Sequence, residues 1–207
     1  MRPFLIILKA SFLVAAISFT IWSSATTLET LSRIEAIESG ALDVQAHAQS
    51  LIDSEKVENA KEWTATGRAL IEKDQSSDDL AIRLLERALL HDQYDYHAWA
   101  LLSYAHTRAA GAFNTSAADA LRHSIQYCPL CDDSLLRWRL LFVIENWSET
   151  PEHIRDSVFE GADLLRWWHL DGEFLASARL TAQQKGIPFD EYRANVDTPV
   201  RAYEIGR

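Results

Sequence analysis

Glycine and proline are scarce in this chain, with 7 and 5 among 207 residues, and β-branched residues form no clusters. Glycine and proline interrupt regular helices, so their scarcity favours a helical protein over a sheet-rich one. The composition excludes bulk disorder, because 48% of the residues are hydrophobic and only 24% are charged. A length of 207 residues suits one domain.

Positive charge is also in short supply. The chain has 20 Lys and Arg against 30 Asp and Glu, which gives a formal net charge of −10. A surface this acidic repels phosphate backbones and anionic lipid headgroups. We therefore expect no nucleic-acid partner.

Catalytic signatures are missing as well. The chain contains no G-x-S-x-G nucleophile motif, no P-loop and no dinucleotide-binding fingerprint. Its 7 histidines show no metal-binding spacing on one helix face. The acid pairs at 78–79 and 132–133 are explained by helix starts, where the helix dipole favours negative charge. We therefore expect a non-enzymatic protein with no catalytic residue, no cofactor and no metal.

The only two cysteines, Cys128 and Cys131, form a C-x-x-C pair. In an oxidising compartment the two thiols can close a small disulfide that pins a turn between helices. A redox dithiol of the thioredoxin type requires a βαβ pattern, which is missing, and a zinc site requires two more ligands at a fixed spacing. We favour a structural disulfide between Cys128 and Cys131, and the redox and metal roles stay open.

The chain does contain a recurring helical pattern between residues 80 and 147. The segments 80–92, 96–108 and 117–127 each place bulky and small apolar residues at helical spacing. Small residues seven positions apart, with a bulky residue between them, let two helices approach closely. The pattern predicts antiparallel helix hairpins that stack on one another.

This pattern resembles the tetratricopeptide repeat (TPR). The Trp, Leu and small residue of that signature correspond to Trp99, Leu102 and Ser103, whereas His106 stands where an aromatic residue is expected. The second half of the repeat is matched by Ala117, Leu121, Ser124 and Pro129. Part of the preceding repeat is matched by Ala81, Leu85 and Ala88. The second-half residues come about two positions late, which predicts a lengthened turn over 111–116.

Residues 1–25 form the strongest single signal in the sequence. Two basic residues, Arg2 and Lys9, precede an apolar run and three small residues. This order is typical of an export signal cleaved after Ala25, and residues 4–22 are also long enough to cross a bilayer as an anchor. We favour a retained single-pass anchor with its amino terminus in the cytoplasm. Either alternative puts the body outside the cytoplasm, which we take to be the bacterial periplasm.

The predicted fold class is all-α, a short TPR-like solenoid of stacked antiparallel hairpins preceded by one N-terminal membrane helix. The predicted segments are the anchor or signal at 1–25, a helical lead-in at 26–59, the TPR-like domain at 60–186 and a C-terminal tail at 187–207. The tail is predicted because its polarity is mixed and shows little periodicity.

Tryptophan is frequent, with 7 residues in the chain. Large aromatic side chains usually fill the core between helices. Adjacent residues of a helix point about 100° apart, so one of the neighbouring pair Trp167 and Trp168 can face a groove. The candidate groove residues for binding a partner are Trp99, His106, Trp138, Trp167 and Trp168.

A second resemblance concerns function. The chain is short and acidic, its repeats are degenerate, and an N-terminal anchor is predicted. Its Cys128–Cys131 pair leads into the Leu- and Arg-rich segment 135–140. In these features the chain is similar to small accessory proteins of bacterial exopolysaccharide synthesis and export. The resemblance implies an assembly role without enzyme activity. We therefore expect a membrane-anchored scaffold for a membrane-associated protein partner. A glycan-binding module that uses an exposed Trp, and a thiol-redox protein, are the alternatives.

Overall fold

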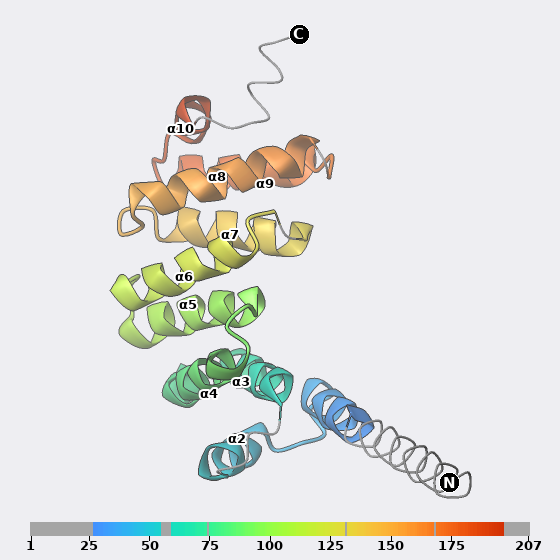
Figure 1. Ribbon diagram of the computed structural model, residues 1–207. Helices are drawn as coiled ribbons and strands as arrows, with labels where there is room; N and C mark the ends of the chain where they lie inside the picture. The colour runs from blue at the N-terminus through green and yellow to red at the C-terminus, as the bar shows by residue number, and fades with distance from the viewer. Residues whose placement is uncertain (1–26, 55–58, 74, 131, 168, 197–207) are drawn as a thin grey trace, which may run out of the picture.

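The computed structural model describes residues 27–54, 59–73, 75–130, 132–167 and 169–196. Every regular element within these ranges is a helix, and they contain no strand. The predicted all-α class is therefore confirmed for this part of the chain. The helices lie one above another and pack against their neighbours, an arrangement compatible with a helical-repeat fold (Figure 1).

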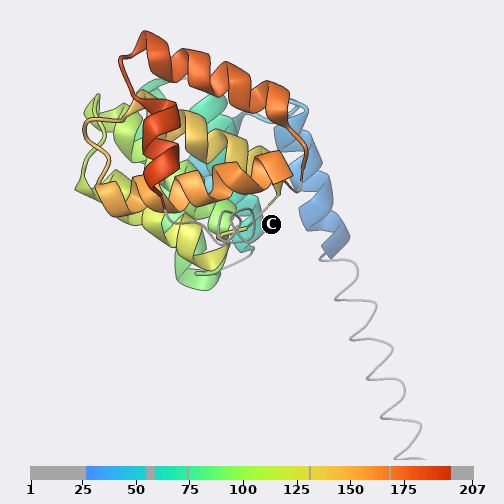
Figure 2. The same ribbon diagram turned by 90° about the horizontal axis from the view of Figure 1, so that it is seen from above.

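The helices in the middle of the stack form antiparallel hairpins (Figure 1). In chain order they are residues 27–38, α2 (Val44–Asp53), α3 (Ala60–Lys73), the short 3₁₀ helix η1 (Gln75–Ser77), α4 (Asp78–His91), α5 (Tyr96–Ala110), α6 (Thr115–Tyr127), α7 (Asp133–Glu145), α8 (Glu152–Trp167), α9 (Gly172–Gln184) and α10 (Phe189–Asn195). The pairs α3–α4, α5–α6 and α7–α8 form hairpins, and α9 contacts both α7 and α8. The helix at 27–38 leans outward from the stack (Figure 2).

Local sequence explains where the helices begin and end. Asp95, Asn114, Asp132 and Asp171 accept hydrogen bonds from backbone N–H groups in the first turns of α5, α6, α7 and α9. Gly111 ends α5 with a left-handed φ of 68°, a conformation that favours glycine. Residues 111–114 then join α5 to α6, within the turn that the late second half of the repeat predicted.

Small side chains allow the helices of a hairpin to approach closely. The Cβ that a larger residue would place on Gly67 of α3 would lie 3.0 Å from Leu85 of α4. Ser103 of α5 is fully buried, and its hydroxyl donates a hydrogen bond of 2.8 Å to the Ala117 carbonyl of α6. The small residues Ala81, Ala105 and Ala117 are also fully buried. These small residues therefore let α3 approach α4, and α5 approach α6, at short range.

The hydrophobic core is continuous along the stack. One buried cluster runs from Ile37 to α6, and a second runs from α5–α6 to α10. Tyr104 of α5 packs against both clusters. Stacked hairpins bury their apolar faces only against their neighbours, so the fold depends on each pair being covered by the next.

Arginines of later helices contact the carboxyl ends of earlier ones. Arg87 of α4 donates a 2.7 Å hydrogen bond to the Ile52 carbonyl at the end of α2. Arg108 of α5 donates to the Ile71 carbonyl near the end of α3 at 2.6 Å. A cation at this position satisfies a carbonyl without an intrahelical partner and faces the negative end of the helix dipole.

Arg108 also forms an ion pair with Asp78, which lies in the first turn of α4 and is 3% exposed. The Arg108 Nε lies 2.9 Å and 2.8 Å from the two carboxylate oxygens. The hydrogen bond to Asp78 raises the pKa of the Arg108 guanidinium. One side chain thus joins the end of α3, the start of α4 and the end of α5.

The lead-in helices are fixed by a buried carboxylate. Glu62 of α3 is 1% exposed and lies 3.0 Å from both the Arg33 guanidinium and the His47 ring. Arg33 belongs to the helix at 27–38 and His47 to α2. Because a buried carboxylate needs charged or hydrogen-bonding partners, these contacts tie the lead-in to the first hairpin.

None of the helices in the described part of the chain is both long and apolar enough to cross a membrane. The predicted anchor or signal at 1–25 lies outside the described residues, so it stays a prediction. The predicted C-terminal tail begins with α10, whose Phe189 is buried and packs on Phe159 of α8 with 5.1 Å between ring centroids. A helix of seven residues is too short to show a clear period in the sequence.

The Asp78–Arg108 pair makes a first testable prediction. We expect Asp78→Asn to lower the free energy of unfolding by about 3 kcal/mol, because it leaves a partly buried guanidinium without its anion. The matched control is Asp79→Asn, which removes a charge from the same helical turn but from an exposed side chain. The control should lose less than about 1 kcal/mol in urea unfolding. Equal losses in the two variants would show that the ion pair does not stabilise the fold.

Candidate functional site

The face formed by the first helices of the hairpins carries a groove. It has a volume of about 210 Å³ and is lined by residues of α3, α5 and α7. Leu101 and Tyr104 of α5 and Trp138 of α7 line it as half-buried side chains. Exposed Arg68 and Glu72 of α3 contribute one charge of each sign. We call this surface the first-helix groove.

A second groove lies on the other side of α5. It has a volume of about 570 Å³ and is lined by residues of α4, α5 and α6. Trp99 and His106 of α5 line it, together with His123 and Tyr127 of α6. We call this surface the α4–α6 groove.

Helical geometry explains how α5 serves both grooves. The lining residues His97, Leu101 and Tyr104 lie on one side of the helix, and Trp99, Leu102 and His106 on the other. At about 100° per residue the two sets are centred roughly 180° apart. Since α5 also packs against α4 and α6, both of its free sides become walls of grooves.

The predicted groove residues therefore do not form one site. Trp99 and His106 line the α4–α6 groove, whereas Trp138 lines the first-helix groove. Trp168 and the side chain of Trp167 lie outside the described residues. The interpretation of these two residues stays a prediction.

The Trp99 ring is held in place by its neighbours. Its Nε1–H donates a 2.8 Å hydrogen bond to the Gln93 carbonyl, and the His123 ring stacks on it with centroids 4.4 Å apart. His123 in turn stacks on Tyr127 at 6.0 Å. One face of the indole is thus covered within the protein. Trp138 is similarly stacked on Phe142, at 4.7 Å.

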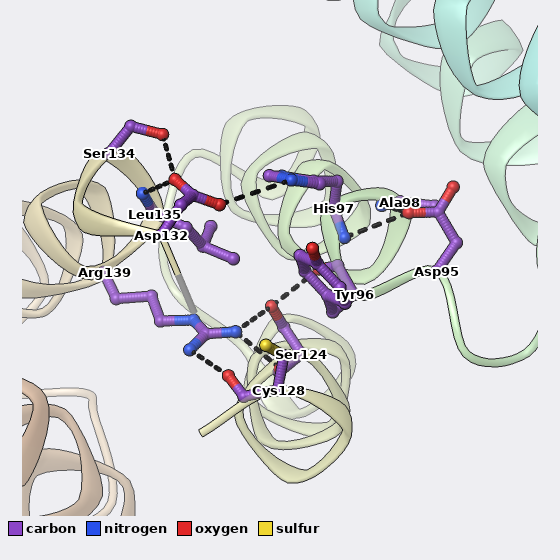
Figure 3. A network of polar contacts seen from close by, with 10 residues as sticks. All are labelled: Asp95, Tyr96, His97, Ala98, Ser124, Cys128, Asp132, Ser134, Leu135 and Arg139. Atoms are coloured by element: carbon purple, nitrogen blue, oxygen red, sulfur yellow. Dashed lines mark hydrogen bonds and ion pairs between the residues drawn. The ribbon is translucent and has the colours of Figure 1, made fainter. Parts of the chain in front are cut away.

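Arg139 organises the region behind the first-helix groove (Figure 3). It is 2% exposed, and its guanidinium donates hydrogen bonds to the Cys128 carbonyl at 2.8 Å and to the Ser124 carbonyl at 2.5 Å. It also donates to the Ser124 hydroxyl, which itself donates to the Tyr96 carbonyl of α5 at 2.7 Å. A side chain of α7 therefore closes the carboxyl end of α6 and reaches α5 through one serine.

Burial lowers the pKa of the Arg139 guanidinium to about 10, and the nearby charge of Asp132 opposes this effect. Arg139 is thus a cation at neutral pH, within a buried site built from carbonyl oxygens. The dipole of α6 supplies the compensating negative potential.

Asp132 connects the same network to the groove. It accepts hydrogen bonds from the Ser134 hydroxyl and the Leu135 N–H, and these hold the pKa of its carboxyl below the usual range. Its other oxygen lies 3.6 Å from Nε2 of His97, which lines the groove. The positions of α5 and α7 on the two sides of the groove are therefore linked through Asp132 as well as Arg139 (Figure 3).

Cys128 is disulfide-bonded and half-buried at the carboxyl end of α6, and its carbonyl is the one that Arg139 contacts. Cys131 lies outside the described residues, so its pairing with Cys128 stays a prediction. Among the described residues no group of three or more His, Cys, Asp or Glu side chains could hold a metal ion.

Sequence reasoning missed Arg139, Tyr104 and Leu101 as members of this region. For Arg139 a signal exists, because it lies three or four residues from buried Leu135, Leu136 and Val143 and so on their side of the helix. A charged residue at core spacing predicts a buried polar contact. No local signal distinguishes Leu101 from other apolar residues of α5.

Comparison of the chain with protein families, with curated proteins and with solved structures finds no match.

We expect Arg139→Met to lower the free energy of unfolding by at least about 2 kcal/mol, because it removes the hydrogen bonds of a buried guanidinium to the Cys128 carbonyl and to the Ser124 carbonyl and hydroxyl. Arg137→Met is the matched control, since Arg137 belongs to the same helix but is 40% exposed and pairs with Asp133 and Asp171. The control should lose less than about 1 kcal/mol. Chemical unfolding followed by far-UV circular dichroism measures both, and comparable losses would contradict the role assigned to Arg139.

The predicted cysteine pair is tested separately. We expect replacement of both Cys128 and Cys131 by Ser to destabilise the fold by about 2 kcal/mol, the entropy of closing so short a loop in the unfolded chain. Reduction of the unaltered protein should give the same loss, and reduction of the variant should change nothing. A stable variant that loses an electron-transfer activity would instead support the redox alternative.

Proposed function

We propose that this chain is a non-enzymatic scaffold that binds a segment of a partner protein in the first-helix groove. The observation that carries the proposal is the convergence of half-buried apolar and aromatic side chains from α5 and α7, beside which α3 places one charge of each sign. A groove of this composition suits an amphipathic segment that places its apolar side chains between α5 and α7.

The hairpins α3–α4, α5–α6 and α7–α8 support a TPR-like architecture. In stacked helical repeats, equivalent helices of successive hairpins line one extended surface, and that surface receives a peptide or a helix. The proposed site occupies this position, because α3, α5 and α7 are the first helices of the three hairpins. We assign the TPR-like character as part of the proposal, on the strength of this correspondence and of the sequence pattern.

The location of the scaffold follows from the N-terminal segment. If residues 1–25 act as an anchor or an export signal, the helical body lies outside the cytoplasm, and its partner is a membrane-associated protein of that compartment. The resemblance of the chain to accessory proteins of exopolysaccharide assembly or export suggests that the partner belongs to such a machinery.

The experiment is crosslinking in membranes, followed by purification of the full-length chain. We expect Leu101→Glu, which places a charge in the groove, to abolish recovery of the partner, because the partner's apolar side chains would have to desolvate a carboxylate between α5 and α7. The matched control is Leu141→Glu, the same change at a leucine of α7 that is 41% exposed and outside the groove. The control should retain the partner.

Thermal unfolding of both variants checks that Leu101→Glu is folded. A second groove variant is Arg68→Glu, which leaves the core intact because Arg68 is exposed. Loss of the partner in all three variants alike, or in none, would contradict the proposed site. Recovery of a glycan in place of any protein would overturn the scaffold proposal. The mass of the purified chain shows in the same experiment whether residues 1–25 are retained.

A further inference from the structure

The α4–α6 groove is the larger of the two, and its composition differs from that of the first-helix groove. Its floor is apolar, formed by buried Leu89, Leu102 and Ala120, and the stacked rings of His123 and Tyr127 form one wall. Apolar surface of this kind gains free energy when a ligand covers it.

The rim of this groove exposes large apolar side chains. Leu90, at the end of α4, is 82% exposed and lines the groove. Tyr94 follows it, is 64% exposed, and packs edge-on against Tyr127 with ring centroids 5.2 Å apart. An exposed apolar rim next to an apolar floor is typical of a surface that another molecule covers.

The charge of the lining is one-sided. Glu86 and Asp119 are exposed carboxylates, and among the residues that the structure describes no Lys or Arg lines the groove. Asp119 has a cation nearby, Arg122 at 3.7 Å on the same helix, whereas the Glu86 charge faces His106. Burial lowers the pKa of His106, so its ring is neutral at pH 7 and does not cancel Glu86.

His123 is held by its own helix. Its Nδ1 lies 2.8 Å from the Asp119 carbonyl, and its Nε2 lies 3.5 Å from the Arg122 guanidinium. The groove therefore combines an apolar floor, aromatic walls and net negative charge.

We propose that the α4–α6 groove binds a cationic segment of a partner protein, in which Lys or Arg residues flank apolar side chains. The apolar side chains cover Leu89 and Leu90, and the cations lie beside Glu86 and Asp119 and against the aromatic walls, where the ring quadrupoles attract them. This site is separate from the first-helix groove, so the chain can hold two segments on opposite sides of α5.

The test is fluorescence anisotropy with the purified full-length chain and a short labelled peptide in which lysine alternates with leucine. We expect saturable binding that the double variant Glu86→Gln, Asp119→Asn weakens about fivefold, the effect of two exposed charge pairs. Leu90→Ser should weaken binding about threefold by removing exposed apolar surface. Because Leu90, Glu86 and Asp119 are all exposed, these variants keep the core intact.

Two controls separate this site from bulk charge and from the first-helix groove. Glu35→Gln with Glu149→Gln changes the net charge equally at exposed residues outside the groove and should leave binding unchanged. Leu101→Glu, which tests the first-helix groove, should also leave it unchanged, so failure of one proposal is distinguishable from failure of the other.

Several results would overturn the proposal. One is the absence of saturable binding. Another is equal binding of a peptide in which glutamate replaces each lysine, or of a peptide in which serine replaces each leucine. A third is equal weakening of binding by the Glu35 and Glu149 control. A dimer in sedimentation that Leu90→Ser dissociates would show that a second copy covers the groove instead.

Discussion

The contact on which this structure most depends joins an arginine side chain to the carboxyl end of an earlier helix. Arg139 does this for α6, Arg108 for α3 and Arg87 for α2, so the same device recurs along the stack. The Cys128, Ile71 and Ile52 carbonyls that accept these hydrogen bonds lie at the carboxyl ends of their helices, and each contact fixes the later helix relative to the earlier one. Small residues bring helices close within a hairpin, and these arginines hold elements together beyond it.

The two grooves follow from this arrangement. The helix α5 packs closely on α4 and α6 through Ala105 and Ser103. One of its two remaining sides faces α3 and α7 and lines the first-helix groove. The other side lines the α4–α6 groove. The Arg139 network then sets the position of α7 against α5, and with it the shape of the first-helix groove (Figure 3). A functional surface on such a stack is thus a consequence of how the hairpins are spaced.

The sequence predicts what depends on local chemistry. Aspartate and asparagine caps, Gly111 and the alternation of small and bulky residues act over one or two helical turns, so the helices and their hairpins could be predicted well. The grouping of Trp99, His106 and Trp138 could not, because it depends on the rotation of α5 and α7 within the stack. The partners of Glu62 and Arg139 lie roughly three to eight helical turns away in sequence, beyond the range of local patterns. The helix α10 is too short to show a period.

Amide hydrogen exchange of the full-length chain, with and without the partner recovered from membranes, shows which helices the partner covers. We expect the partner to slow exchange in α5 and α7, whose side chains form the first-helix groove, and to leave the lead-in helix at 27–38 unchanged. Slower exchange confined to helices outside α3, α5 and α7, or no change in any helix, would contradict the assignment of this groove as the binding surface.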